Sequence, residues 1–201
     1  MPNSAKVGNG TSDTSVSATG KARRDYKRGS GRERVLDAYT HILREEGAGA
    51  ATLDEVARRA DISKGGLLHH FGSKEALTEG LIARLEEQNA EDIAATMGNG
   101  VNGIEAFIAA SMSASDDYSE TFMAVIKLAG SGNDAVDEGL RRTLETWRDA
   151  LDIDVKDPVL SRLIQLVGDG LYLHALVGAK PDEIDAEVVP LLRSLVEEGQ
   201  K

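Results

Sequence analysis

The chain has 201 residues, of which 41% are hydrophobic but only 4% aromatic, so one or two domains with an aliphatic core are expected. The absence of cysteine excludes disulfide bonds, a thiol nucleophile and thiolate metal ligands. The formal net charge of −11 argues against a nucleic-acid partner, but the distribution of charge reverses this conclusion. Residues 1–77 carry 13 basic and 10 acidic side chains, whereas residues 78–201 carry 10 basic and 24 acidic ones. This asymmetry indicates a module that faces a polyanion, attached to an acidic body.

Residues 1–29 are predicted to form a tail without stable structure, because they are rich in Ser, Thr, Gly, Asn and Ala and nearly lack large apolar side chains. They contain no apolar stretch of signal-peptide type, and the chain has no run of about 18 apolar residues that could span a membrane. A cytoplasmic protein with no membrane partner is therefore expected. The tail ends in the basic segment Lys21–Arg28, which is either a solvated charged tail or an arm that lies along DNA phosphates or in a minor groove.

Three helices are predicted after the tail, where helix caps precede apolar residues at helical spacing. Ser30 begins a capping box at the start of the first helix, which ends at Gly47. Thr52 caps the second helix, and Ser63 caps the third, which runs over residues 64–71. Two short helices joined by a tight turn, preceded by a packed first helix, make a candidate helix-turn-helix domain.

The rest of the chain also follows the helical period, so the predicted fold is all-α with about nine helices. A helix-turn-helix domain over residues 30–77 precedes a larger helical C-terminal domain over residues 78–201. Pro190 is expected to kink the last helix. The predicted helices beyond the third span residues 74–97, 102–114, 119–129, 133–151, 158–177 and 182–198.

The residues around the predicted turn give a more specific indication. Residues 52–77 read TLDEVARRADISKGGLLHHFGSKEAL. This stretch closely resembles the DNA-binding domain of the tetracycline-repressor (TetR) family of bacterial transcription regulators, in which the corresponding part commonly reads VSKGTLYHYFPSKEAL. The resemblance extends over residues 32–81, and the chain departs from the family pattern at Gly66, Leu68 and Gly72.

The resemblance implies a homodimer whose two recognition helices bind the half-sites of an inverted repeat in double-stranded DNA. It also implies a C-terminal domain that dimerises and encloses a small-molecule ligand, with ligand and DNA opposing each other. A repressor released from its operator by a ligand is the predicted function. The alternative is a DNA-binding module whose C-terminal domain binds a protein or only dimerises. The chain contains no nucleophile elbow, Walker loop or zinc-protease motif, so neither an enzyme nor a cofactor is expected.

The third predicted helix, the recognition helix, suits close contact with DNA. Its N-terminus carries Ser63 and Lys64, where free N–H groups and the helix dipole favour phosphate. The two glycines that follow lower helix propensity but let the backbone approach closely. His69 and His70 are expected to face outward, about 100° apart, which disfavours a metal site there. The predicted DNA-contacting residues are Thr52, Ser63, Lys64, Gly65, Gly66, Leu68, His69, His70 and Lys74.

The predicted helix over residues 158–177 is apolar around most of its circumference, which is typical of a helix buried on all sides. It is expected to pair with the last helix and with the same two helices of a second subunit in a four-helix bundle. The alternative is burial inside its own domain, with His174 hydrogen-bonded within its own subunit. Small residues every four positions form a ridge that lets another helix approach. The predicted interface residues are Gly170, His174, Gly178, Leu192 and Leu195.

Asp169 and Tyr172 share a second face of that helix, rotated about 100° from the ridge. This face is expected to meet aromatic residues of the other helices, and a mostly apolar wall with few polar groups is what a small-molecule site requires. A buried carboxylate there would select a cation or hydrogen-bond donors. Alternatively, Asp169 pairs with Arg148 or reaches solvent, and the aromatic stripes are plain core. The predicted ligand-binding residues are Phe107, Met112, Phe122, Trp147, Asp169 and Tyr172.

Overall fold

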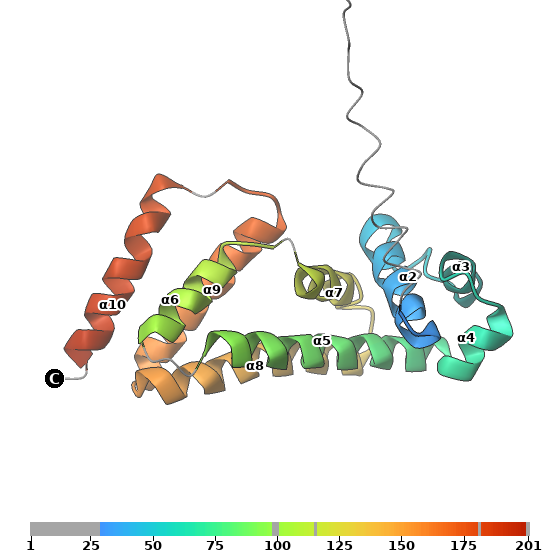
Figure 1. The fold of residues 1–201 in the computed structure, drawn as a ribbon, viewed down its shortest axis with the longest axis horizontal. Coiled ribbons are helices and arrows are strands. Elements are labelled where there is room, and N and C mark those ends of the chain that lie inside the picture. Colours follow the sequence, from blue (N-terminus) through green and yellow to red (C-terminus); the bar gives the residue numbers. More distant parts are fainter. Residues whose placement is uncertain (1–28, 98–100, 115, 181, 200–201) are drawn as a thin grey trace, which may run out of the picture.

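The computed structural model describes residues 29–97, 101–114, 116–180 and 182–199, and these residues contain helices and no strand (Figure 1). The predicted all-α fold is therefore confirmed. All of the predicted tail except Gly29 lies outside the described residues. The α-helices are α2 (Gly31–Glu46), α3 (Leu53–Arg59), α4 (Lys64–His70), α5 (Lys74–Thr96), α6 (Val101–Ser111), α7 (Asp117–Ile126), α8 (Asp134–Val155), α9 (Pro158–Leu176) and α10 (Val188–Gly199).

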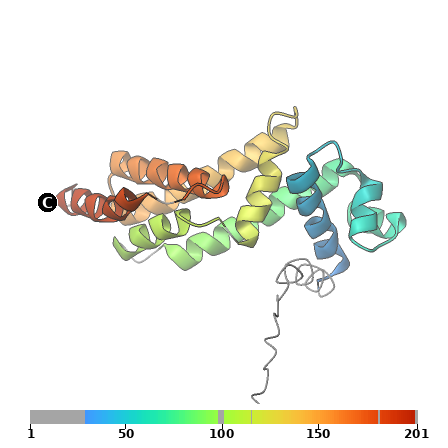
Figure 2. The same ribbon diagram turned by 90° about the horizontal axis from the view of Figure 1, so that it is seen from above.

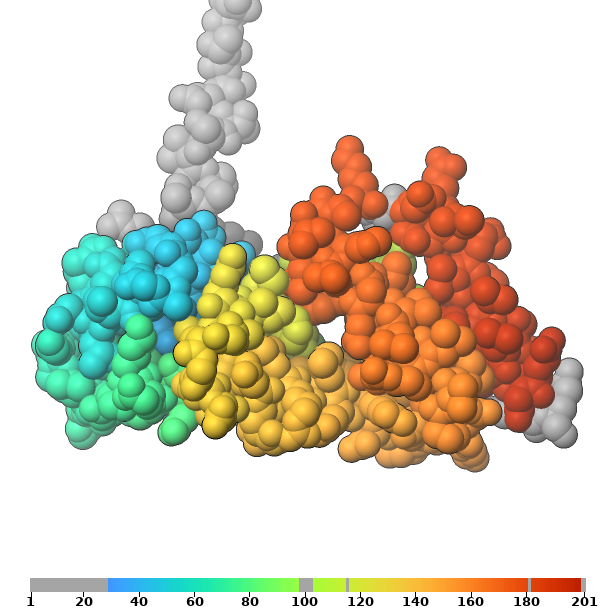
Figure 3. Space-filling model, turned by 180° about the vertical axis from the view of Figure 1, so that it is seen from behind, coloured from blue at the N-terminus to red at the C-terminus, as the bar shows by residue number. Residues whose placement is uncertain are grey.

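Helices α5 and α8 lie side by side and form the long axis of the molecule (Figure 1). Helix α2 and the short helices α3 and α4 gather at one end of α5, whereas α6, α9 and α10 gather at the other end (Figure 2). Helix α7 packs on both α2 and α5, so it connects the two ends. The space-filling view shows the same order, from blue and green at one end, through the yellow of α7, to orange and red at the other (Figure 3). We call α2–α4 with the start of α5 the head, and the remaining helices the body.

Two apolar clusters hold these helices together. The first lies in the head and extends through Val125 of α7 and Val136 of α8. The second lies at the far end of the body, where Ile104, Ile164 and Leu192 come from three different helices. Both clusters are mainly aliphatic, as the composition predicts. Helix α5 runs unbroken past the predicted domain boundary after residue 77, so the head and the body share one continuous helix.

The predicted helix starts in the head are confirmed. The side chains of Ser30, Thr52, Ser63 and Ser73 each accept a hydrogen bond from the backbone N–H three residues later, at 3.0–3.3 Å. Each cap satisfies an N–H group that has no partner within its helix. Because this signal is local, the sequence pattern is sufficient to place these helices.

The predicted single helix over residues 182–198 is wrong. A short 3-10 helix, η1 (Glu183–Glu187), precedes α10, and Pro190 lies in the first turn of α10. A proline in a first turn removes an N–H group that would have no partner within the helix, so no kink is required there. In the part of the chain described above, no helix combines the length and the apolar character needed to cross a bilayer.

Candidate DNA-binding surface and ligand cavity

Two buried residues fix the recognition helix α4 to the rest of the head. Leu67 is fully buried, and Phe71, the residue that caps the C-terminus of α4, is 5% exposed. The ring of Phe71 lies against Gly80 of α5, where an added Cβ atom would stand 2.5 Å from the ring. The guanidinium of Arg32 lies over the same ring, 5.3 Å from its centre. The side of α4 that faces the rest of the head is therefore fixed by packing, and the opposite side is free to contact another molecule.

Most residues predicted to contact DNA lie at the surface of the head. The exposed ones are Thr52, Ser63, Lys64, Gly65, Leu68, His69 and His70, whereas Gly66 and Lys74 are half-buried. The ammonium of Lys64 lies 2.9 Å from the carboxylate of Asp54, in an exposed ion pair that contributes little to stability. The ammonium of Lys74 donates to the backbone oxygen of Ala48 at 3.3 Å. Because an ammonium group has three donors, each lysine retains capacity for a phosphate.

Packing within the chain does not explain the two glycines at the start of α4. A Cβ atom on Gly65 would meet only Ser63 Oγ, at 3.9 Å, and the nearest atom to a Cβ on Gly66 would be that same oxygen, at 3.3 Å. Gly65 is exposed and Gly66 is half-buried, so the surface is open at Gly65 above all. This opening suits a close approach of the helix backbone to another molecule.

His70 does not take the outward direction expected from its helix position. A Cβ atom on Gly31 would lie 2.5 Å from His70 Nε2, so the imidazole lies against the start of α2. The ring centres of His69 and His70 are 5.7 Å apart. Since His70 is still exposed, we place it at the edge of the candidate DNA-binding surface.

A cavity of about 290 Å³ lies between α5, α6, α7, α8 and α9. Its walls are rich in aromatic rings. Tyr118, Phe122 and Tyr172 form one cluster with ring centres 5.6–6.2 Å apart, and Phe107 and Trp147 form a pair at 5.0 Å. These are five of the eight Phe, Tyr and Trp residues in the chain, so the scarce aromatic residues are concentrated at this site. We call it the aromatic cavity.

Three carboxylates line the aromatic cavity, those of Asp92, Asp116 and Asp169. Burial raises the pKa of Asp92 and of Asp169 above the usual range, and the positive charge of Arg162 offsets only part of the rise at Asp169. No Lys, Arg or His is among the described residues of the lining. Aromatic faces combined with negative charge that is only partly compensated suit a ligand that is both apolar and cationic.

Five of the six residues predicted to bind a ligand line the aromatic cavity: Phe107, Phe122, Trp147, Asp169 and Tyr172. Met112 does not, and it lies instead beside a much smaller hollow that it shares with His174. Arg148, the alternative partner of Asp169, lies 4.0 Å from the carboxylate of Asp152. The Tyr172 hydroxyl donates to Ser119 Oγ at 2.9 Å, and burial raises the pKa of Tyr172 to about 12.

Two residues of the cavity, Asp92 of α5 and Tyr118 of α7, give no signal in the sequence pattern. Only the packing of α5 on α7 brings them together. The Tyr118 hydroxyl donates to Oδ1 of the buried Asn89 at 3.3 Å, and Asn89 Nδ2 donates to Thr146 Oγ1 at 2.7 Å. The cavity wall is thereby hydrogen-bonded to α5, the helix that continues into the head.

The predicted dimer-interface residues fall into two groups. Those on or next to α9 are exposed, namely Gly170, His174 and Gly178. On α10, Leu192 is 3% exposed and packs inside its own chain, so it is not available to a partner, and Leu195 is half-buried. Leu191, which is 60% exposed, takes the outward position instead. Helix α9 and its C-capping residue also expose apolar side chains, which we call the α9 stripe: Val159, Leu163, Leu166, Leu173 and Val177.

Two family models match the chain. Residues 35–81 match bacterial regulatory proteins of the tetR family, and residues 103–197 match a tetracyclin repressor-like C-terminal domain. Together these segments take in more than half of the chain. They include α4 and most of the helices that enclose the aromatic cavity.

Two curated relatives match a smaller part of the chain. The HTH-type transcriptional regulator AlkX of Mycobacterium tuberculosis is 36% identical over 78 residues, which make up 38% of this chain and 37% of AlkX. The HTH-type transcriptional regulator BetI of Paraburkholderia phytofirmans is 44% identical over 48 residues, which make up 24% of this chain and 25% of BetI. The chain thus spans only a quarter to somewhat over a third of the length of these relatives.

Solved structures match over most of the chain. A transcriptional regulator from Rhodococcus sp. Rha1 has a TM-score of 0.66 at 22% identity, with 85% of this chain and 97% of that chain covered. The multidrug binding protein EbrR complexed with malachite green has a TM-score of 0.64 at 20% identity, with 82% and 96% covered. At such identities the likeness shows a shared fold.

Proposed function

Because the chain belongs to the tetR family of bacterial regulatory proteins, we propose that it is a DNA-binding transcriptional repressor, released from its operator by a small-molecule ligand. The observation that carries this proposal is the exposed outer side of α4, a helix with two glycines in its first turn that is anchored by Leu67 and Phe71. In helix-turn-helix proteins such a helix lies in the major groove. A cytoplasmic homodimer, joined through the α9 stripe, would present two copies of α4 to an inverted repeat.

The first experiment removes one lysine of the head at a time. Lys64→Ala and Lys74→Ala are each expected to weaken binding to DNA of any sequence and to flatten the salt dependence of log affinity by about one unit, as the loss of one phosphate contact does. Lys127→Ala removes the same charge at the exposed end of α7, outside the head, and is the control. Mobility shifts at several salt concentrations measure both quantities. If both head variants bind like the parent, α4 is not the recognition helix.

The proposed effector is a lipophilic aromatic cation that binds in the aromatic cavity. Tyr118, Tyr172 and Trp147 offer ring faces to such a cation, and the three carboxylates of the lining offer opposite charge. The similar structures of EbrR are complexes with malachite green and with ethidium, both of which are aromatic cations, and this supports a ligand of the same class.

Trp147 makes binding in the cavity measurable, because it is the only tryptophan of the chain and lies in the cavity wall. Ethidium is expected to quench its fluorescence. Asp169→Asn is expected to weaken ethidium binding about tenfold, since the amide keeps the shape of the carboxylate but not its charge. Asp149→Asn, at an exposed position of α8 outside the cavity, is the control. Equal affinity in the parent and in Asp169→Asn would contradict the role of Asp169.

The same binding reaction should depend on pH. The raised pKa of Asp92 and of Asp169 means that these carboxyls take up protons at a higher pH than exposed aspartates do. Because the cation prefers the ionised carboxylates, its affinity is fully present above the raised pKa values and falls as the pH drops through them. A fluorescence titration at successive pH values measures the loss, and a pH-independent affinity would contradict this account.

Helix α5 provides the connection between ligand and DNA. It carries Asp92 of the cavity and Asn89, the partner of the Tyr118 hydroxyl, and its other end lies in the head. A ligand that displaces Tyr118 therefore changes a hydrogen bond to the helix that positions α4. A difference of about 1–3 kcal/mol between the two arrangements changes operator affinity about 5–150-fold. If no lipophilic cation alters operator binding, a body that only dimerises or binds a protein is favoured instead.

A further inference from the structure

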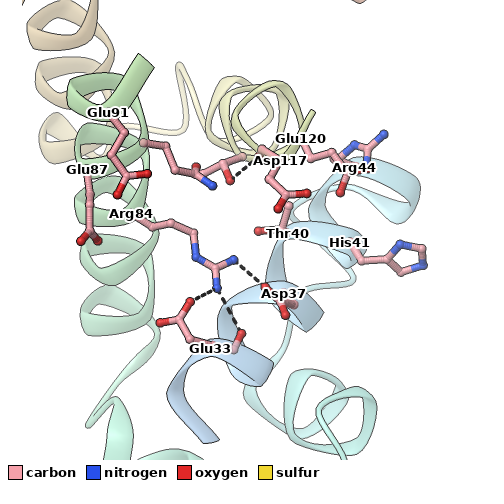
Figure 4. A pocket seen from close by; sticks show the side chains of 12 residues that line it. Glu33, Asp37, Thr40, His41, Arg44, Arg84, Glu87, Glu91, Asp117 and Glu120 are labelled. Carbon is pink, nitrogen blue, oxygen red and sulfur yellow. Dashed lines mark hydrogen bonds and ion pairs between the residues drawn. The ribbon is translucent and has the colours of Figure 1, made fainter. Parts of the chain in front are cut away.

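A second, polar cavity lies where the head meets the body. It has a volume of about 560 Å³ and lies between α2 of the head and helices α5 and α7 (Figure 4). We call it the junction groove. It shares no lining residue with the aromatic cavity. Its walls carry six carboxylates, those of Glu33, Asp37, Glu87, Glu91, Asp117 and Glu120.

Two arginines neutralise part of this wall. Arg84 reaches from α5 to α2, where it donates to the carboxylate of Asp37 at 2.7 Å and also pairs with Glu33 (Figure 4). Arg44 lies 2.8 Å from the carboxylate of Glu120. Burial raises the pKa of Asp37 in spite of its contact with Arg84, and the nearby negative charges of Glu33 and Asp117 add to the rise.

The other three carboxylates have no ion-pair partner among the described residues. Glu87 and Glu91 stand on α5, and Asp117 stands across the groove on α7 (Figure 4). All three stand at exposed positions on the two walls of one groove. Like charges on these walls repel, and the repulsion is relieved when a cation lies between the walls. These three groups mark the place where positive charge is missing.

Two buried polar atoms of the groove are an independent indication of a binding site. Thr40 is only 5% exposed, yet its hydroxyl oxygen has no hydrogen-bond partner within the described residues, and the same holds for the buried Oε1 of Gln88. Native structures leave few buried polar atoms unsatisfied. Thr40 lies between Asp37 and Asp117 with its side chain directed into the groove (Figure 4). Because an amide oxygen only accepts hydrogen bonds, the missing partner of Gln88 is a donor.

We infer that the junction groove binds a small organic polycation of the aliphatic polyamine class. Its ammonium groups lie against Glu87, Glu91 and Asp117 and donate to Oε1 of Gln88 and to the Thr40 hydroxyl. Such a ligand supplies both the positive charge and the N–H donors that the groove lacks. A metal ion does not fit, because no group of three or more His, Asp or Glu side chains in the described part of the chain is placed to hold one.

Because the groove lies between the head and the body, a ligand bound there contacts both. Its walls come from α2 of the head and from α5 and α7, so a bound polycation ties the head to the body. A ligand that favours one arrangement of the head relative to the body also changes the affinity of the head for the molecule that the head binds. The proposed site does not depend on the operator or on the ligand of the aromatic cavity, and it is tested without either.

Calorimetric titration of the full chain with spermidine tests the proposal. We expect one site per chain, with an affinity that falls as salt rises, because screening weakens the attraction. The double variant E87Q/E91Q is expected to weaken binding at least about tenfold. The matched double variant E79Q/E197Q removes the same charge from exposed positions outside the groove and is expected to change the affinity less than about twofold.

Thr40→Val and Gln88→Met separate a built site from general attraction to an acidic surface. Each removes an unsatisfied polar atom, so neither should lower the thermal stability, and each is expected to weaken spermidine binding about fivefold. The proposal is overturned if the parent shows no binding at millimolar spermidine, or if the two double variants weaken binding equally. It is also overturned if both Thr40→Val and Gln88→Met bind like the parent, or if an oligolysine peptide binds and spermidine does not.

Discussion

Replacing Phe71 with Ala is expected to lower the free energy of unfolding by about 3–5 kcal/mol and to abolish operator binding. The ring is 5% exposed, lies against Gly80 and carries the guanidinium of Arg32 over its face. Without it, Leu67 is the only buried residue that anchors α4 among the described contacts. A helix of 7 residues is not stable by its own hydrogen bonds. Urea denaturation measures the free energy, and a mobility shift measures DNA binding.

Leu68→Ala is the matched control, since it also shortens an apolar side chain of α4. Leu68 is 40% exposed, so its loss should change the free energy of unfolding by less than about 1 kcal/mol while it weakens DNA binding. Gly80→Ala should act in the same direction as Phe71→Ala, because the new Cβ atom would displace the ring. If Phe71→Ala unfolds at the same urea concentration as the parent, α4 is anchored by something other than this ring.

The head was the most predictable part of the molecule because its signals are local. Ser63 and the residues around it specify where α4 begins, and a separation of four positions places Leu67 and Phe71 on one face. The side chain of His70 illustrates the limit of such reasoning. Its direction is set by the space that Gly31 of α2 leaves open, which no pattern within α4 contains.

For the aromatic cavity, the sequence predicts which residues share a face of one helix, but not which helices pack together around it. Asp169 and Tyr172 are three positions apart on α9, so helical spacing alone places them on one face. Asp92 and Tyr118 belong to α5 and α7, and their proximity depends on the packing between those helices. Met112 follows the last turn of α6, and the end of that helix leaves it beside a different hollow.

The two adjacent leucines of α10 show the same limit. Leu191 and Leu192 are equally apolar and point about 100° apart on a helix, so the sequence does not indicate which one faces the core. Helix α10 packs on α6 and α9 and directs Leu192 into the second apolar cluster. Leu191 is exposed instead, so it is a better candidate for contact with a partner than the predicted Leu192.

One charge in the α9 stripe is expected to convert the proposed dimer into a monomer. The stripe consists of five aliphatic residues at helical spacing with exposed fractions between 44% and 79%, a large apolar surface for a single subunit. Gly170 lies within it, and a Cβ atom there would meet nothing within 4 Å, so a facing helix has room to approach. In a two-fold interface each stripe residue occurs twice, so Leu166→Glu buries two carboxylates without partners.

Leu166→Glu is therefore expected to raise the dimer dissociation constant at least about 100-fold and to weaken operator binding, because two half-sites need two heads. Leu166 is 51% exposed, so the subunit itself should stay folded, which circular dichroism checks. Ile153→Glu places the same charge on α8 at a position that is 73% exposed and outside the stripe, and it should leave the dimer intact. Sedimentation velocity over a range of protein concentrations measures the dissociation constant. If the Leu166→Glu dimer is as tight as the Ile153→Glu dimer, the interface lies elsewhere. A carboxylate buried without a partner in the interface would have weakened the dimer.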